Sequence, residues 1–154
     1  GLELKIRVVK IRIGLILTKD GGALPQMEKP IKLFVGAALG YGKQWMPWIH
    51  LNDMVAIFCS AAEDENFSGA YNACAPNLVN NSQFTHILGK TLKRPIWPFN
   101  VPGFVLKFIL GEMSILALMS NRTSSKKLTD TGFIFTYPTL QKALNEIYET
   151  STTH

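Results

Sequence analysis

The residues best suited to chemistry lie in one stretch, Gly40–Met54, which reads Gly-Tyr-Gly-Lys-Gln-Trp-Met-Pro-Trp-Ile-His-Leu-Asn-Asp-Met. Its first candidate is the pair His50 and Asp53, which could act as a general base oriented by a carboxylate. The alternative is structural: Asp53, or Asn52 beside it, caps the helix that follows, and His50 is a core histidine. We favour the structural interpretation and predict no catalytic residue here.

The same stretch offers groups that could bind a substrate. Lys43 and Gln44 could hold an anionic group against an aromatic wall made by Trp45 and Trp48. The alternative is a solvated lysine above packed tryptophans. We assign these four residues, together with His50, to the substrate side of a cleft.

Other site types find little support. The three histidines, His50, His86 and His154, do not cluster with cysteines, so we predict no metal site. No Gly-x-Ser-x-Gly turn is present for a hydrolase. Cys59 and Cys74 are far apart in apolar surroundings, which predicts buried free thiols and a reducing compartment.

The composition is that of a globular domain. The chain has 154 residues, of which 47% are hydrophobic and 18% charged. Its net charge of +5 is compatible with an anionic ligand, a nucleic acid or a membrane surface. The basic residues are scattered, however, and Lys126-Lys127 is the only adjacent pair of lysines, so we expect no nucleic-acid partner.

Membrane insertion and secretion are not expected. The apolar window Val101–Ser120 contains Pro102, Lys107 and Glu112, which favours a buried or half-buried helix. Gly1–Asp20 alternates basic and apolar residues and lacks the core of a signal peptide. We therefore predict a cytoplasmic protein with no membrane partner.

The elements that would position the candidate residues alternate between strand and helix. β-branched residues predict a mostly buried strand near Lys5–Leu17. Shorter strands are predicted at Trp45–His50 and Gly69–Ala73, and Pro95–Pro102 is predicted to be a connector. Apolar spacing predicts four main helices. These helices are Asp53–Glu63, Ser82–Lys93, Gly103–Met119 and Leu140–Glu149.

The central stretch resembles the His-x-x-Asp segment of the extended short-chain dehydrogenase/reductase superfamily, in its epimerase-like branch. The pattern there is Gly-x-Gly-Arg-Gln-Tyr-Met-Pro-Trp-Ile-His-x-x-Asp-Met, with Lys43 here in place of arginine and Trp45 in place of tyrosine. The same branch has Gly-x-Tyr-Asn, matched by 69–72, and Gly-Phe-x-Phe-x-Tyr-Pro, matched by 132–138. The resemblance runs from Leu4 to Tyr148 and covers the C-terminal half of that family.

The resemblance implies an α/β fold: the C-terminal part of a Rossmann-like NAD(P)-binding domain with a small, mainly helical substrate lobe. Residues 1–154 would be one partial domain, with Rossmann strands near 5–17, 45–50 and 69–73 and the lobe near 23–40 and 95–149. It also implies that Arg12, Ile13 and Gly14 lie beside the nicotinamide, with isoleucine where proline is frequent. The cofactor of the complete protein would be NADP or NAD.

Two motifs of that family are missing from this sequence. One is the glycine-rich turn that seats the dinucleotide pyrophosphate, and the other is the Tyr-x-x-x-Lys pair that supplies the base. None of the four tyrosines has a lysine four residues later. We therefore expect this chain alone to be inactive and to bind the cofactor weakly.

Two functions remain open. The first is the substrate-binding portion of a nicotinamide-dependent sugar-nucleotide epimerase or reductase, acting on a small molecule that is either anionic or neutral. The second is a non-catalytic protein-interaction module that docks through the apolar segments Leu15–Leu17 and Val101–Met119. In either case the strand Lys5–Leu17 would expose an apolar edge, so we expect self-association or a companion chain.

Overall fold

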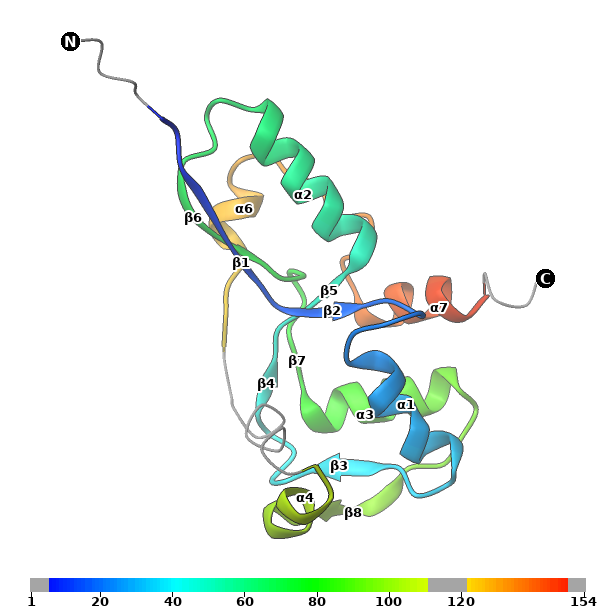
Figure 1. Ribbon diagram of the computed structural model, residues 1–154. Coiled ribbons are helices and arrows are strands. Elements are labelled where there is room, and N and C mark those ends of the chain that lie inside the picture. Colours follow the sequence, from blue (N-terminus) through cyan, green and yellow to red (C-terminus); the bar gives the residue numbers. More distant parts are fainter. Residues whose placement is uncertain (1–5, 111–121, 150–154) are drawn as a thin grey trace.

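The computed structural model describes residues 6–110 and 122–149 and has an α/β architecture (Figure 1). The strands are short and the helices pack around them. In chain order the elements are β1 (Val9–Ile13), β2 (Leu15–Leu17), α1 (Leu24–Lys32), β3 (Ala37–Leu39), β4 (Trp45–Met46), β5 (Trp48–His50), α2 (Leu51–Glu63), β6 (Gly69–Ala73), β7 (Val79–Asn80), α3 (Asn81–Thr91), β8 (Trp97–Val101), α4 (Gly103–Leu110), α6 (Lys126–Thr129) and α7 (Leu140–Glu149).

The strands in the described part of the chain form four two-stranded pairs. β1 runs parallel to β6, β2 parallel to β5, and β3 parallel to β8. β4 is antiparallel to β7. Parallel pairing of strands distant in sequence is expected for an α/β protein, in which helices cross over between strands.

The predicted strand Lys5–Leu17 is two strands in the structure, because the chain changes partner at Gly14. The backbone N–H of Gly14 donates to the carbonyl of Ala73 (3.1 Å), whereas that of Leu15 donates to the carbonyl of Pro47 (2.6 Å). β1 thus follows β6, and β2 follows β5. Pro47, which has no N–H, divides the predicted strand Trp45–His50 in the same way.

The structure corrects the predicted cap of α2. The helix begins at Leu51, and its N-cap is His50, whose Nδ1 accepts from the backbone N–H of Asn52 at 3.1 Å. Asp53 and Asn52 are therefore not the cap. Asp53, 1% exposed, reaches across to a distant loop instead.

The remaining elements agree with the predictions in part. β6 and α7 coincide with the predicted Gly69–Ala73 and Leu140–Glu149. α4 covers the first part of the predicted helix Gly103–Met119, and the rest of that prediction lies outside the described residues. The predicted connector Pro95–Pro102 is wrong, because Trp97–Val101 forms β8. A proline is tolerated there since β8 pairs on one side with β3.

Two apolar cores hold the elements together. One lies where α1, α3 and α7 meet β2 and β5, and the other lies between α2 and β6. The buried residues of the first are Leu17, Leu24, Ile31, Trp48, Ala75, Phe84, Leu88, Leu140, Ala143, Leu144 and Ile147. Those of the second are Ile49, Ile57, Ala61, Phe67, Tyr71, Ala73, Leu128 and Phe135. Among the described residues, no helix combines the length and apolar character needed to cross a bilayer.

α1 and α7 are joined by a hydrogen bond in which the hydroxyl of Tyr148 donates to Glu28 at 2.5 Å. Burial, and then the carboxylate of Glu28, raise the pKa of Tyr148 well above its ordinary value. Because the pKa is higher in the folded protein than in the unfolded chain, the stabilisation is complete below about pH 10 and is lost as the pH rises above it.

Replacing Tyr148 by phenylalanine should therefore make the protein less sensitive to alkali. We expect the free energy of unfolding of the unchanged protein to fall faster above about pH 10 than that of the Tyr148→Phe variant. Urea unfolding across a pH series measures both. Tyr41→Phe, which changes an exposed tyrosine, is the control and should follow the unchanged protein. Parallel curves for all three proteins would contradict the expectation.

Candidate ligand pocket

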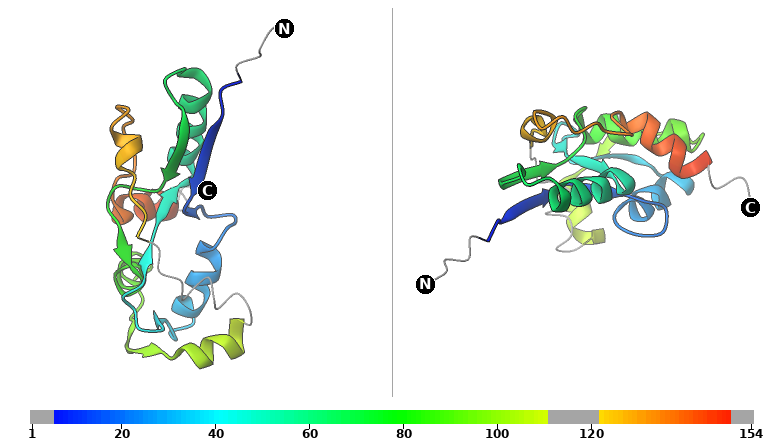
Figure 2. Two further views of the ribbon diagram at one scale, coloured as in Figure 1. Left: turned by 90° about the vertical axis from the view of Figure 1, so that its left-hand side faces the viewer. Right: turned by 90° about the horizontal axis from the view of Figure 1, so that it is seen from above.

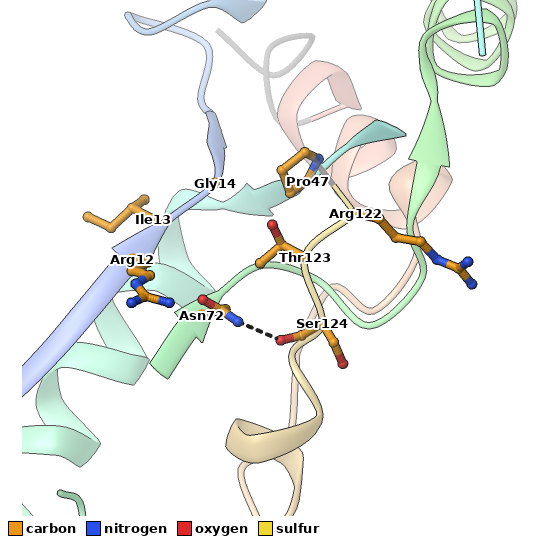
Figure 3. Close-up of a pocket in the computed structure, with 8 residues that line it drawn as sticks. All are labelled: Arg12, Ile13, Gly14, Pro47, Asn72, Arg122, Thr123 and Ser124. Atoms are coloured by element: carbon orange, nitrogen blue, oxygen red, sulfur yellow. Dashed lines mark hydrogen bonds between the residues drawn. The ribbon is translucent and has the colours of Figure 1, made fainter. Parts of the chain in front are cut away.

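A pocket of about 280 Å³ opens where β1 and β6 end (Figure 3). The end of β1 contributes Arg12, Ile13 and Gly14, and β6 contributes Asn72. The segment between β4 and β5 contributes Pro47, and the chain before α6 contributes Arg122, Thr123 and Ser124. The carboxyl ends of parallel strands are the usual place for ligands in open α/β sheets.

Gly14 allows the backbone segments to meet at this pocket. A Cβ atom on Gly14 would lie 2.5 Å from the carbonyl oxygen of Pro47 and 3.0 Å from its carbonyl carbon. Both contacts are with backbone, which cannot turn aside as a flexible side chain can. Any other residue at this position would push β1 away from the β4–β5 segment.

Among the described residues, the polar lining of the pocket has no carboxylate. It consists of two guanidinium groups, one amide and two hydroxyls. Asn72 donates through Nδ2 to the backbone carbonyl of Ser124 at 3.0 Å, which ties the 122–124 segment to β6. Such a lining favours an anionic or hydrogen-bond-accepting ligand.

The two arginines do not converge in this structure. The guanidinium of Arg122 lies over the ring of Trp45, 5.4 Å from its centroid. In Figure 3 the Arg122 side chain extends away from Arg12 and from the other lining residues. Arg12 is therefore the cation on the β1 side of the pocket, and the stem of Arg122 forms part of the opposite wall.

Cys74 lies beside the pocket and has an unreactive thiol. Its thiol donates to the backbone carbonyl of Thr123 at 3.6 Å, and burial raises its pKa to about 11. It is a neutral thiol near pH 7 and not a nucleophile. Cys59 differs from the prediction of a buried thiol, because it is exposed on α2.

The structure brings three of the predicted site residues together and separates others. Arg12, Ile13 and Gly14, predicted to lie on the cofactor side, all line the pocket. The ring of Trp45 contacts the guanidinium of Arg122, which is one of the residues that line the pocket.

The other predicted substrate residues point elsewhere. Lys43 is exposed and does not line the pocket. Gln44 is buried and donates through Nε2 to the carbonyl of Leu39 at 2.9 Å. Trp48 is buried in the first core and donates through its indole N–H to the carbonyl of Asn77 at 3.1 Å.

His50 and Asp53 act as anchors for distant parts of the chain. His50, 4% exposed, contacts Glu146 of α7 through Nε2 at 2.9 Å and stacks on Tyr137 with ring centroids 4.0 Å apart. Since Nδ1 accepts from Asn52, Nε2 carries the proton and donates. Both oxygens of Asp53 accept from backbone N–H groups, those of Thr136 and Tyr137, at 2.9 Å each. Both side chains therefore make structural contacts, but the predicted roles differ: His50 is the cap of α2, and Asp53 binds the distant 136–137 backbone.

Sequence reasoning missed the 122–124 wall of the pocket. The available signal was a run of polar residues, Arg-Thr-Ser-Ser, between an apolar stretch and the basic turn Lys126-Lys127. Nothing local in that run indicates that it lies against β1 and β6, which are far away in sequence. In the described residues, no group of three or more His, Cys, Asp or Glu is placed to hold a metal ion.

Comparison with known proteins identifies relatives. Residues 101–147 match a family described as a domain of unknown function, DUF1731. An epimerase family protein of Arabidopsis thaliana, the chloroplastic SDR39U1 homologue, is 38% identical over 144 residues, which cover 94% of this chain and 41% of the relative. The chain therefore spans less than half the length of this relative.

Two solved structures share the fold and sequence similarity. The human epimerase family protein SDR39U1, solved with NADPH, superposes with a TM-score of 0.86 at 32% identity, covering 93% of this chain and 48% of the human one. A nucleoside-diphosphate sugar epimerase from Corynebacterium glutamicum gives 0.69 at 30% identity, covering 95% and 28%. The resemblance to the C-terminal half of an epimerase-like short-chain dehydrogenase/reductase is confirmed, and with it the α/β fold class.

Proposed function

We propose that this chain is the C-terminal, substrate-binding portion of a nicotinamide-dependent sugar-nucleotide epimerase- or reductase-like protein. The observation that carries the proposal is the grouping of Arg12, Ile13 and Gly14 at the mouth of one pocket, at the ends of parallel strands. The human relative was solved with NADPH, which supports a nicotinamide cofactor for the complete protein. We also propose a cytoplasmic location, which the free thiols Cys59 and Cys74 support.

The pocket fits a flat ring beside an anionic group. Gly14 presents bare backbone, and Ile13, 46% exposed, offers an apolar flank. A nicotinamide bound here would supply or accept the hydride, whereas the residues of this chain would orient ring and substrate. Arg12 and the amide and hydroxyl groups opposite it would hold a phosphate or carboxylate of the substrate.

In this proposal the base that moves the proton is supplied by a second polypeptide segment, since the chain has no Tyr-x-x-x-Lys pair. Two surfaces fit such a segment. β1 pairs on one side with β6 and, among the described residues, has no strand on its other side. Close to it, Ile6 and Val8 are 78% and 58% exposed, and Val55 and Phe58 of α2 are 51% and 46% exposed. A parallel strand and a helix would cover them.

The test is a hybrid protein in which the amino-terminal half of the Arabidopsis relative precedes this chain. We expect the chain alone to bind NADPH and NADH weakly and to have no epimerase or reductase activity. We expect the hybrid to bind NADPH, as measured by cofactor fluorescence. Loss of a general base alone typically costs about 10²- to 10⁴-fold in rate.

A matched pair of variants locates the anionic site within the hybrid. Arg12→Met should weaken binding of inorganic pyrophosphate about tenfold or more. Lys10→Met, an equal loss of charge two residues earlier on the same strand and outside the pocket, should change it little. Tight NADPH binding by the unaccompanied chain as a monomer, or equal effects of the two variants, would contradict the proposal.

The second candidate function, docking of a partner through apolar segments, is supported only in part. Leu17 is fully buried and Leu15 and Ile16 are half-buried, so Leu15–Leu17 offers no apolar face. Phe104 and Phe108 of α4 are 77% and 94% exposed. The predicted segment Val101–Met119 therefore has exposed apolar side chains through which a partner could dock.

A further inference from the structure

Exposed aromatic and aliphatic side chains gather at the end of the molecule formed by α4, β8, β3 and the turn after α1. In Figure 1 these elements lie at the lower end, away from α2, and the side view in Figure 2 places α4 and β8 at the same end. We call this surface the aromatic end face. It consists of Leu33 (73% exposed), Phe34 (52%), Trp97 (55%), Phe99 (74%), Phe104 (77%) and Phe108 (94%).

The secondary structure presents these side chains outward. Phe104, Lys107 and Phe108 are spaced three and four residues apart on α4, and all three are exposed, so they share one face of the helix. Trp97 and Phe99 are two residues apart on β8, where every residue from Trp97 to Asn100 is exposed. A surface this apolar is unusual for a protein that contacts only water.

Phe34 is held in a conformation that bulky residues rarely adopt. Its φ of 62° lies in the left-handed region, at the residue that follows the cap of α1. The indole N–H of Trp97 donates to the carbonyl of Phe34 at 2.8 Å, and the guanidinium of Arg94 lies 4.8 Å from the centre of the Phe34 ring. These contacts keep the ring at the surface beside a positive charge.

Basic groups lie beside these side chains: Lys107 shares the exposed face of α4 with Phe104 and Phe108, and the guanidinium of Arg94 lies over the Phe34 ring. Residues 29–52 and 66–110 include no aspartate or glutamate. The nearest carboxylate before them, Glu28, is paired with Lys32 at 2.8 Å. The basic residues within these two segments are Lys29, Lys32, Lys43, Lys90, Lys93, Arg94 and Lys107.

We propose that the aromatic end face binds the interfacial region of an anionic lipid bilayer. Tryptophan and phenylalanine side chains insert at the boundary between headgroups and acyl chains, while lysine and arginine attract anionic headgroups. The inference departs from the sequence-based expectation of no membrane partner, which considered a spanning segment and not a surface. It is independent of the proposed catalytic family and of the pocket.

The charge and the mixture of side chains on this face favour a lipid bilayer over a second copy of the chain or a nucleic acid. A second copy of the chain would bring the same positive charges face to face across a symmetric contact. A single-stranded nucleic acid stacks on aromatic rings, but it gains little from the aliphatic Leu33 that shares this surface. An anionic bilayer accepts aliphatic, aromatic and basic groups together.

The test is co-sedimentation of the full chain with vesicles of phosphatidylcholine alone and of phosphatidylcholine mixed with phosphatidylserine. We expect binding to the mixed vesicles that weakens at high salt, and little binding to the neutral ones. The variant Phe104→Ser/Phe108→Ser should bind the mixed vesicles at least about tenfold more weakly. Val55→Ser/Phe58→Ser, which removes exposed apolar groups from α2 at the other end, should bind like the unchanged protein.

A second variant separates charge from folding. Lys93→Glu/Lys107→Glu changes exposed side chains only, so it should fold, as far-ultraviolet circular dichroism would show, and should lose the preference for phosphatidylserine. The proposal is overturned by no binding, by equal binding to neutral vesicles, or by equal losses in the α2 variant. It is also overturned if a single-stranded RNA displaces the vesicles, if the phenylalanine variant abolishes self-association instead, or if the hybrid protein described above does not bind.

Discussion

Replacing Asp53 by asparagine should lower the free energy of unfolding by about 2–4 kcal/mol. Asp53 is 1% exposed, and its two oxygens accept from the backbone N–H groups of Thr136 and Tyr137. Hydrogen bonds to a charged acceptor are roughly twice as strong as neutral ones. Asparagine keeps one oxygen but turns an NH₂ group toward the second N–H, leaving two donors face to face in a buried site.

Urea unfolding followed by circular dichroism measures this loss. Glu63→Gln makes the same carboxylate-to-amide change at the exposed end of the same helix, and we expect it to alter stability by less than about 0.5 kcal/mol. If Asp53→Asn is as stable as Glu63→Gln, then the Asp53 carboxylate does not anchor the loop that contains Thr136 and Tyr137.

Replacing Gly14 by alanine should destabilise the protein by about 1–3 kcal/mol and deform the ligand pocket. The added Cβ meets the carbonyl of Pro47, to which the N–H of Leu15 donates at 2.6 Å. Relief of the clash must move β1 or the β4–β5 segment, so the hydrogen bond that begins β2 is strained as well. Both walls of the pocket shift with it, since Gly14 and Pro47 both line the pocket.

Gly21 provides the matched control for Gly14. A Cβ atom on Gly21 meets nothing within 4 Å, so Gly21→Ala should change stability by less than about 0.5 kcal/mol or raise it slightly. Urea unfolding and pyrophosphate binding by the hybrid protein measure the two effects of Gly14→Ala. Equal behaviour of the two alanine variants would show that the strand junction tolerates a side chain.

The sequence predicted elements whose signals are local. β6 begins at a glycine and ends before a proline-containing turn, and α7 follows Thr139 with regular apolar spacing, so their bounds could be read directly. β8 was missed because its proline indicates a connector. Only the neighbouring strand β3, some sixty residues earlier, makes that segment a strand.

The pocket was half predictable for the same reason. Arg12, Ile13 and Gly14 are consecutive and match a family pattern, so sequence alone could propose them. The opposite wall, Arg122 to Ser124, is placed by packing against β6 and has no pattern of its own. His50 was assigned to the substrate, whereas its contact is Glu146, 96 residues later in the chain.

The anchoring of His50 and Asp53 has a consequence for how the chain folds. Their partners lie 83 to 96 residues further on, in the last part of the described chain. On a ribosome, α2 would emerge with its first-turn carboxylate uncompensated and would stay so until α7 and the loop before it have been synthesised. Contacts of such long sequence separation slow folding, because a large loop must close before they form. Nascent chains of this protein should therefore depend on protection by chaperones until α7 and the loop before it have been synthesised.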